Sequence, residues 1–231
     1  MPVSGKRKTA PPARKRVRRG NEEDAQQLRG ELIDAAMKLF AQGGLEAVSM
    51  RAVAAQVGVS AMAPYRYFAD KAELLSELWQ FVIRAVCDQM AVAIARSRGG
   101  RARQRASLVT FLDYWEAHPD HYRLVYMTDQ TTRRETSPHL VQAPVYGEIL
   151  QLVQGVTEDL AREIGADMTH AKLAGDIRFA MQLGCLQATL VNQRYPWSER
   201  NRFRAAYVEQ IIATMERCLL HGPDPEPRGG R

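Results

Sequence analysis

Residues 49–70 read SMRAVAAQVGVSAMAPYRYFAD and decide how the chain is interpreted. Ser49 is placed to cap a helix, because its side chain can accept a hydrogen bond from a free N–H of the first turn. Gly58 can end that helix, since glycine tolerates the left-handed backbone found at helix ends. Ser60 can then cap a second helix that runs through Tyr67. The stretch therefore predicts two short helices joined by a tight turn.

This pair of helices has the spacing of a helix-turn-helix unit. Ala54 supplies a small side chain where two steeply crossing helices approach most closely, and Gly58 follows four residues later. In the units that read DNA, the second helix enters the major groove. A small helical hairpin inside an ordinary bundle is the alternative interpretation of the same residues.

Residues 28–75 resemble the DNA-binding domain of the tetracycline-repressor (TetR) family. The matching positions are Leu32, Ala35, Ala36, Leu39, Phe40, Gly43-Gly44-Leu45, Val48-Ser49-Met50-Arg51, Ala54, Gly58-Val59-Ser60, Tyr65-Arg66-Tyr67-Phe68, Lys71, Glu73 and Leu74-Leu75. They occur in order and at the spacing of the family, over roughly a fifth of the chain. The resemblance implies a homodimeric bacterial transcription regulator, most often a repressor, that binds a palindromic operator.

The chain departs from the family pattern at residues 61–64, Ala-Met-Ala-Pro. The family tends to carry a polar residue or glycine there, then a threonine or similar residue, then an apolar helix former. Pro64 fits if it lies in the first turn of the recognition helix, where its missing N–H has no partner to lose. Ala61 and Met62 can contact thymine methyl groups but cannot form bidentate hydrogen bonds with purines.

Other side chains of this segment predict contacts with DNA. Tyr65 and Tyr67 each carry a hydroxyl on a rigid ring, which suits a phosphate or a base edge, although core aromatics with a hydrated hydroxyl are the alternative. Ser60 can present its N–H and hydroxyl to a phosphate. By the resemblance, Arg29 and Lys71 contact phosphates, with solvated surface residues as the alternative. The full predicted set is Arg16, Arg18, Arg19, Arg29, Ser49, Met50, Ser60, Ala61, Met62, Pro64, Tyr65, Tyr67 and Lys71.

The basic character of the chain is confined to its N-terminus. The net charge is +6, and the first twenty residues hold eight of the 32 lysines and arginines and no acid. The rest of the chain therefore carries 24 basic and 26 acidic side chains. We expect residues 1–20 to form a disordered arm that binds phosphates or a minor groove. A solubilising leader, a cloning remnant and a nuclear-import signal are the alternatives.

The remaining sequence predicts an all-α protein. The chain has 231 residues, is 45% hydrophobic and shows few period-two alternations. We expect a helix-turn-helix head over residues 21–70, a C-terminal effector-binding and dimerisation domain over 71–222, and a flexible tail over 223–231. The expected helices cover about 23–42, 71–97, 101–117, 119–128, 139–164, 169–194 and 198–220, with an exposed loop over 129–138.

The C-terminal domain is expected to enclose a ligand and to dimerise. Aromatic, sulfur-containing and amide side chains predict an apolar cavity with a few polar anchors, although each one alone fits a plain core position. The predicted set is Phe111, Tyr114, Trp115, Tyr122, Tyr126, Met127, Tyr146, Met181, Gln182 and Cys185. The family resemblance implies that the last two helices pair with their copies in a second subunit. The alternative is that they only close the core of one subunit.

Signatures of catalysis and of metal binding are weak. His118 and His121 flank Asp120, but we expect Pro119 to prevent both imidazoles from pointing at one ion, so we predict no metal. The sequence carries no local signature of a Ser-His-acid site, a phosphate loop or a dinucleotide fingerprint. We therefore expect neither an enzyme nor a bound cofactor.

The cysteine pattern indicates a reducing compartment. Cys87, Cys185 and Cys218 are far apart in apolar helical segments, so we expect buried, reduced thiols in a cytoplasmic protein. No stretch approaches the ~18 uninterrupted apolar residues of a membrane span, and we predict no membrane partner.

The sequence as a whole predicts a DNA-binding transcriptional regulator. We expect a homodimeric repressor that is released from its operator by a small apolar or amphipathic effector. The alternative is a DNA-binding dimer whose helical body serves only dimerisation or protein interaction.

Overall fold

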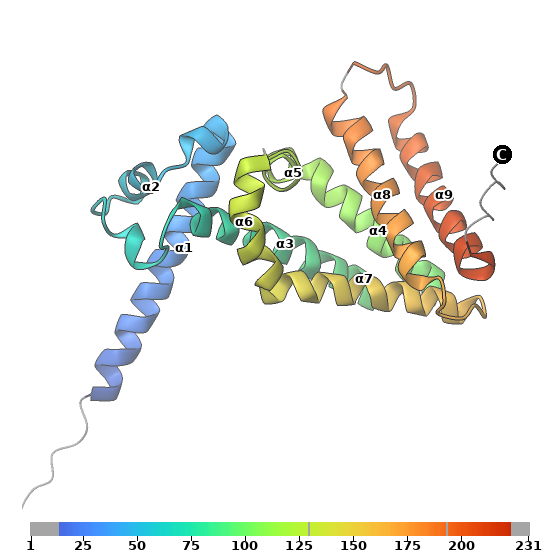
Figure 1. The fold of residues 1–231 in the computed structure, drawn as a ribbon, viewed down its shortest axis with the longest axis horizontal. Coiled ribbons are helices and arrows are strands. Elements are labelled where there is room, and N and C mark those ends of the chain that lie inside the picture. Colours follow the sequence, from blue (N-terminus) through green and yellow to red (C-terminus); the bar gives the residue numbers. More distant parts are fainter. Residues whose placement is uncertain (1–13, 129, 193, 223–231) are drawn as a thin grey trace, which may run out of the picture. The chain divides into compact units, whose positions relative to one another are not determined.

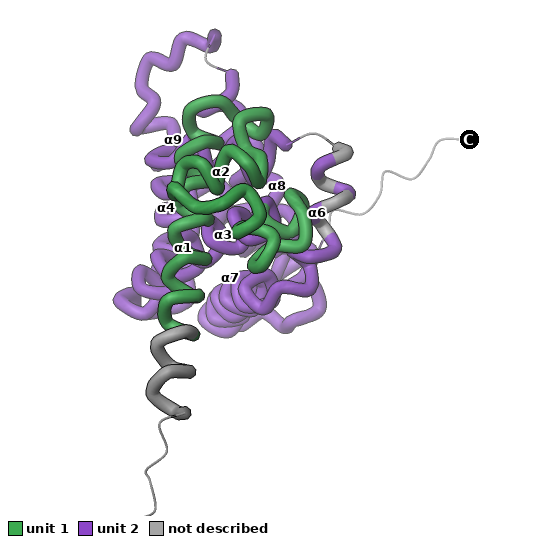
Figure 2. The backbone as a smooth tube through the Cα atoms, turned by 90° about the vertical axis from the view of Figure 1, so that its left-hand side faces the viewer, with its two compact units in different colours: residues 1–74 green, residues 75–231 purple. Residues whose placement is uncertain are grey.

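The computed structural model describes the backbone of residues 14–128, 130–192 and 194–222, and most of their side chains. These residues are helical and include no strand, which confirms the predicted all-α class. The chain divides into two compact units, residues 1–74 and 75–231 (Figure 2). The predicted tail over residues 223–231 and the first part of the basic arm lie outside the described residues.

The first unit is built on helix α1 (Arg14–Ala47) and α2 (Met50–Val57) (Figure 1). We expected a disordered arm up to residue 20 and a helix from about Glu23, whereas α1 already begins at Arg14. Its regular part ends as predicted, because the backbone leaves helical geometry at Gly43 and Gly44. The buried residues of this unit are Leu32, Ile33, Ala35, Ala36, Phe40, Val48, Met50, Val53, Ala54, Pro64, Phe68 and Leu74.

Helix α2 has the two ends that its sequence predicts. Ser49 Oγ accepts a hydrogen bond from the N–H of Ala52 at 3.1 Å. Gly58 adopts φ 82°, which is left-handed, and its N–H donates to the carbonyl of Ala54 at 3.0 Å. The side chain of Ala54 is buried, as a close helix crossing requires. The first half of the helix-turn-helix is therefore confirmed.

The second half differs from the expected helix over residues 61–67. The structure has turns followed by one 3-10 turn, η1 (Pro64–Arg66). The reason is the position of Pro64, four residues after Ser60. A helix capped by Ser60 would take its first backbone hydrogen bond from the N–H of residue 64, and proline has none. We call residues 60–67 the recognition turn.

Helix α3 (Lys71–Ala95) begins with two side-chain hydrogen bonds that cap its first turn. The N–H of Glu73 donates to Asp70 Oδ1 at 2.8 Å, while Glu73 Oε2 accepts from the N–H of Ala69 at 2.6 Å. Among the described residues, α3 alone is long and apolar enough to cross a membrane by length and composition. Its buried residues, which include Leu78, Val82, Val86 and Met90, are those of a core helix.

The second unit contains most of α3 and the six α-helices that follow. They are α4 (Gly100–Ala117), α5 (Pro119–Tyr126), α6 (Gln130–Gln142), α7 (Pro144–Glu163), α8 (Ala171–Leu186) and α9 (Arg200–His221). A π-helical segment, η2 (Gln187–Val191), continues α8. Helix α4 is central, because it packs against α7, α8 and α9 and leads directly into α5 (Figure 1). Helix α7 begins at Pro144, whereas we expected one helix from about residue 139 to 164.

The loop predicted over residues 129–138 is wrong, because α6 covers most of it. Polar composition suggested a loop, but the helix has a buried face formed by Thr136, Leu140 and, just after its end, Ala143. Thr136 Oγ1 also donates to the carbonyl of Thr132 at 2.8 Å. Packing against α7 therefore overrides the local signal.

The three cysteines are free and buried, as predicted. Burial raises the pKa of all three thiols, and the pKa of Cys185 reaches about 11. Each therefore stays protonated at neutral pH, which makes it a poor nucleophile.

The N-terminus of α4 lies directly on α7. The N–H groups of Gly100 and Arg101 donate to the carboxylate of Glu163, which replaces a local side-chain cap. Gly100 is buried, and a Cβ at this position would overlap the backbone of Asp159 and Leu160. Only glycine fits this crossing.

We predict that Gly100→Ala destabilises the protein by about 1–3 kcal/mol, because the added methyl group forces α4 away from α7. Urea unfolding followed by circular dichroism measures the change. Gly155→Ala is the matched control on α7, where a Cβ meets no atom within 4 Å. The control should be stabilised by about 0.4–1 kcal/mol, and an equally stable Gly100→Ala variant would contradict the close crossing.

Candidate nucleic-acid interface and ligand pocket

The recognition turn presents a row of exposed side chains held by two buried ones. Pro64 and Phe68 are buried in the first unit. The exposed side chains are Ser60, Ala61, Met62 (68% exposed), Tyr65 (48% exposed) and Arg66. The N–H groups of Tyr67 and Phe68 both donate to the carbonyl of Pro64, at 2.9 and 3.0 Å. The two buried side chains anchor the turn, which offers two hydroxyls, a thioether and a guanidinium to a partner.

Two of the predicted DNA contacts are corrected by burial. Met50 is 6% exposed and Pro64 is also buried, so their side chains belong to the core of the first unit. Tyr67 is half-buried, with its ring centroid 6.5 Å from that of Phe68. Only part of its side chain is therefore open to a partner.

The predicted cations have partners within the first unit. The guanidinium carbon of Arg29 lies 5.4 Å from the ring centroid of Phe68, a cation-π distance. Lys71 Nζ donates to the carbonyl of Leu45 at 2.8 Å. An ammonium group has three donors, so two remain for a phosphate. The side chains of Arg16, Arg18 and Arg19 lie outside the described residues.

Arg66 is a candidate contact that the sequence interpretation missed. It is exposed beside Tyr65 on η1. Its exposure on this 3-10 turn makes it available to a partner. Ser49 is exposed, and its hydroxyl can still donate a hydrogen bond while it caps α2.

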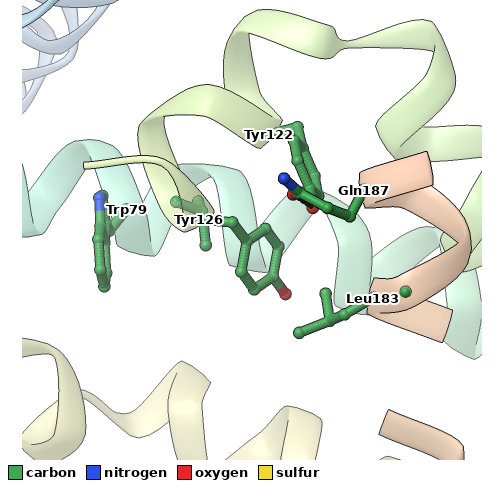
Figure 3. A pocket seen from close by; sticks show the side chains of 7 residues that line it. Trp79, Tyr122, Tyr126, Leu183 and Gln187 are labelled. Carbon is green, nitrogen blue, oxygen red and sulfur yellow. Dashed lines mark hydrogen bonds between the residues drawn. The ribbon is translucent and has the colours of Figure 1, made fainter. Parts of the chain in front are cut away.

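A pocket of about 460 Å³ opens between α3, α5 and α8 in the second unit (Figure 3). It is lined by Trp79, Tyr122, Val125, Tyr126, Leu183, Gly184 and Gln187. Figure 3 shows Tyr126 between Trp79 and Leu183, with Tyr122 next to Gln187. The hydroxyl of Tyr122 donates to Gln187 Oε1 at 3.3 Å, and Trp79 Nε1 donates to the carbonyl of Leu124 at 3.0 Å. The lining is mainly apolar with a few polar groups, as in sites for small ligands.

Only two of the ten predicted ligand contacts line this pocket, namely Tyr122 and Tyr126. Phe111, Tyr114, Trp115, Gln182 and Cys185 are buried in the core, Tyr146 and Met181 are half-buried elsewhere, and Met127 is 46% exposed. The sequence missed Trp79 and Gln187, because they come from helices far apart in the chain. Burial raises the pKa of both lining tyrosines, which therefore remain neutral.

The histidine pair next to α5 is closer than expected. The possible ligand atoms of His118, Asp120 and His121 lie within 4.8 Å of one another, so Pro119 does not separate them. The imidazole rings are stacked, with centroids 4.8 Å apart and a 15° angle between planes. These three side chains could therefore hold a metal ion, and the expectation that Pro119 keeps them apart is wrong. His121 Nδ1 also lies 2.8 Å from the hydroxyl of Tyr114, and burial is the main cause that lowers the pKa of His121.

Residues 32–78 match the family described as "Bacterial regulatory proteins, tetR family". The transcriptional activator FasR of Mycolicibacterium smegmatis is 26% identical over 80% of this chain and 78% of its own. The transcriptional repressor KstR2 of Mycobacterium tuberculosis is 26% identical over 72% of this chain and 88% of its own. These relatives are named as transcriptional regulators, which confirms the expectation of a regulator instead of an enzyme.

Solved structures of transcriptional regulators have a similar fold. The crystal structure of the transcriptional regulator FadR of Bacillus subtilis in complex with stearoyl-CoA superposes with a TM-score of 0.59 at 14% identity. The match covers 84% of this chain and 98% of that one. The architecture of a helix-turn-helix head and a helical body is therefore shared.

We predict that Tyr65→Phe weakens binding to an operator fragment by about tenfold, because it removes one hydrogen bond to a charged phosphate. The exposed ring stays in place, so the melting temperature should not change. Fluorescence anisotropy on DNA selected from a random pool provides the measurement. Phe68→Ala is the contrasting variant, since it removes the buried anchor and should unfold the head. Unchanged affinity of Tyr65→Phe would assign that hydroxyl to solvent.

Proposed function

We propose that this chain, whose residues 32–78 match the tetR family of bacterial regulatory proteins, is a cytoplasmic homodimeric repressor of transcription. Each head would place its recognition turn in one major groove of a palindromic operator. A small amphipathic effector would bind the C-terminal unit and release the DNA. The coarser function, a DNA-binding transcriptional regulator, is shared by the named relatives.

The recognition turn is the observation that carries this proposal. Its exposed side chains project from a turn that is fixed by two buried residues, Pro64 within it and Phe68 directly after it. Because its backbone is already fixed, the recognition turn loses little conformational entropy when it binds. Methyl and thioether groups of Ala61 and Met62 suit thymine methyls, while Tyr65 and Arg66 suit phosphates or base edges. We therefore propose that the turn recognises DNA mainly through apolar contacts with bases in the groove and through polar contacts with phosphates or base edges.

The last two helices support a dimer. Helices α8 and α9 pack against each other and are adjacent in Figure 1. Along α9, Ala206, Ala213 and Leu220 recur every seven residues and are all exposed in the single subunit. On α8, Phe179 is 49% exposed and Ala180 is exposed beside it. A second copy would cover this stripe of small and apolar residues with close helix contacts.

The effector part of the proposal rests on the pocket and on a structural relative. The pocket is apolar with tyrosine hydroxyls and one amide. FadR of Bacillus subtilis was solved with stearoyl-CoA, a long amphipathic ligand. We propose a ligand of this general character for the present chain. The named relatives include one activator and one repressor, so the direction of regulation is part of the proposal and not of the comparison.

A selection of binding sites from genomic DNA is the primary experiment. Palindromic sites with two half-sites about one helical turn apart are the expected result. Reporter expression from such a site should rise when the protein is deleted. Recovery of no sequence-specific site would overturn the proposal.

We predict that replacing Arg16, Arg18 and Arg19 by glutamine lowers affinity for operator and random DNA alike. The slope of log affinity against log salt should fall by about 0.9 for each phosphate contact that is lost. Glutamine preserves the helical propensity of this part of α1. A charge-matched control replaces the exposed residues Arg96, Arg98 and Lys172 of the second unit. An unchanged salt slope would remove the basic arm from DNA binding.

We predict that Ala213→Asp converts the dimer into monomers, because a carboxylate would be buried without a partner at the subunit contact. Light scattering after size-exclusion chromatography measures the mass. Operator affinity should drop by about 100-fold or more, since the two heads lose their avidity. Gln151→Asp, at an exposed position of α7, is the control and should remain dimeric. A dimeric Ala213→Asp variant would place the interface elsewhere.

A further inference from the structure

The interior of the second unit holds a cation without a counter-ion. Arg178 on α8 is 1% exposed, and no carboxylate of the described side chains pairs with it. Its Nη2 donates to Ser107 Oγ on α4 at 2.6 Å, and its Nε has no hydrogen-bond partner. Burial lowers the pKa of Arg178 to about 10, so it remains charged at neutral pH. An isolated buried charge is costly unless an anion compensates it.

Other buried polar atoms near this contact also lack partners. Gln104, one turn before Ser107 on α4, has both its Oε1 and its Nε2 unsatisfied and is 0% exposed. Gln182, one turn after Arg178 on α8, has an unsatisfied Oε1 and is 2% exposed. The two helices pack against each other. Buried polar groups in proteins are nearly always paired, so such a group of orphans indicates an absent partner.

An aromatic track leads from this cluster to the pocket. Ser107, Phe111 and Trp115 follow one another at four-residue intervals on α4, and all are buried. The indole of Trp115 lies 6.0 Å from the ring of Tyr122 and 5.2 Å from that of Tyr126, between centroids. Both tyrosines line the pocket. Trp115 Nε1 is a further buried donor without a partner.

We propose that Arg178, Ser107 and Gln104 form an internal subsite for the carboxylate of an amphipathic effector whose apolar chain runs along Phe111 and Trp115 toward the pocket. The distance from Ser107 to Trp115 along α4 is about 12 Å, which matches a medium-length alkyl chain. This inference rests on the proposed effector function and specifies the ligand as an organic acid. Arg178 Nε and the amide of Gln104 would donate to the carboxylate oxygens.

The subsite is closed in this structure. Its side chains are fully buried, so a ligand has to move Tyr122 and Tyr126 away from Trp115 to enter. Those tyrosines sit on α5, a short helix of eight residues between two bends. Binding would therefore exchange an uncompensated charge for an ion pair and displace the wall of the pocket, which links occupancy to conformation.

Calorimetric titration of the full-length protein with octanoate, dodecanoate and the neutral isostere 1-dodecanol tests the proposal. Arg178→Met should weaken binding of the carboxylates roughly 30-fold and leave 1-dodecanol unchanged. Lys172→Met is the matched control on the same helix, at a side chain that is 89% exposed, and should bind all probes as the parent does. Equal losses for acid and alcohol, or no loss for the acid, would overturn the proposal.

The melting temperature without ligand provides a second readout. Methionine fills much of the volume of the arginine stem, so Arg178→Met should melt at an equal or higher temperature than the parent. An arginine with a purely structural role would instead lower the melting temperature when removed. If Arg178→Met does not fold, Arg178 has a structural role and the proposal is overturned.

Operator binding by the same preparations separates this inference from the proposed function. A parent protein that binds its operator but none of the carboxylates would leave DNA-binding regulation in place and overturn the carboxylate subsite. A parent protein that binds dodecanoate with dependence on Arg178 but selects no DNA site would support the subsite and overturn the repressor.

Discussion

The second unit depends on the contact between the start of α4 and the end of α7. The carboxylate of Glu163 holds the first N–H groups of α4, and Gly100 lets the two backbones approach without a side chain between them. The remaining face of α4 then packs against α8 and α9 and carries the residues behind the pocket. One fixed crossing thus sets where Ser107, Phe111 and Trp115 lie in the core.

The head shows which features the sequence could predict. Ser49, Gly58 and Asp70 act through neighbours a few residues away, so their capping roles follow from local chemistry alone. The recognition turn did not follow as simply. A single missing N–H at Pro64 replaces an expected helix by a 3-10 turn, on which Arg66 is exposed. A residue-by-residue count from the cap to the proline would have found it.

The body was harder to predict because its contacts join distant helices. The helices themselves were largely recoverable from apolar periodicity, but α6 was mistaken for a loop since its buried face is formed with α7. Aromatic residues that seemed suited to a ligand are mostly core, while Trp79 and Gln187, which are far apart in the sequence, complete the pocket. The sequence indicates which residue types could line a pocket, but tertiary packing decides which of them do.

The sulfur chemistry of the chain has a practical consequence. All three native thiols are buried and have raised pKa values. Reagents that react with thiolates should therefore not modify them while the protein is folded. A cysteine introduced on the surface can then be labelled with a fluorophore without first removing the natural ones. The native sequence is therefore suited to fluorescence measurements with a single introduced label.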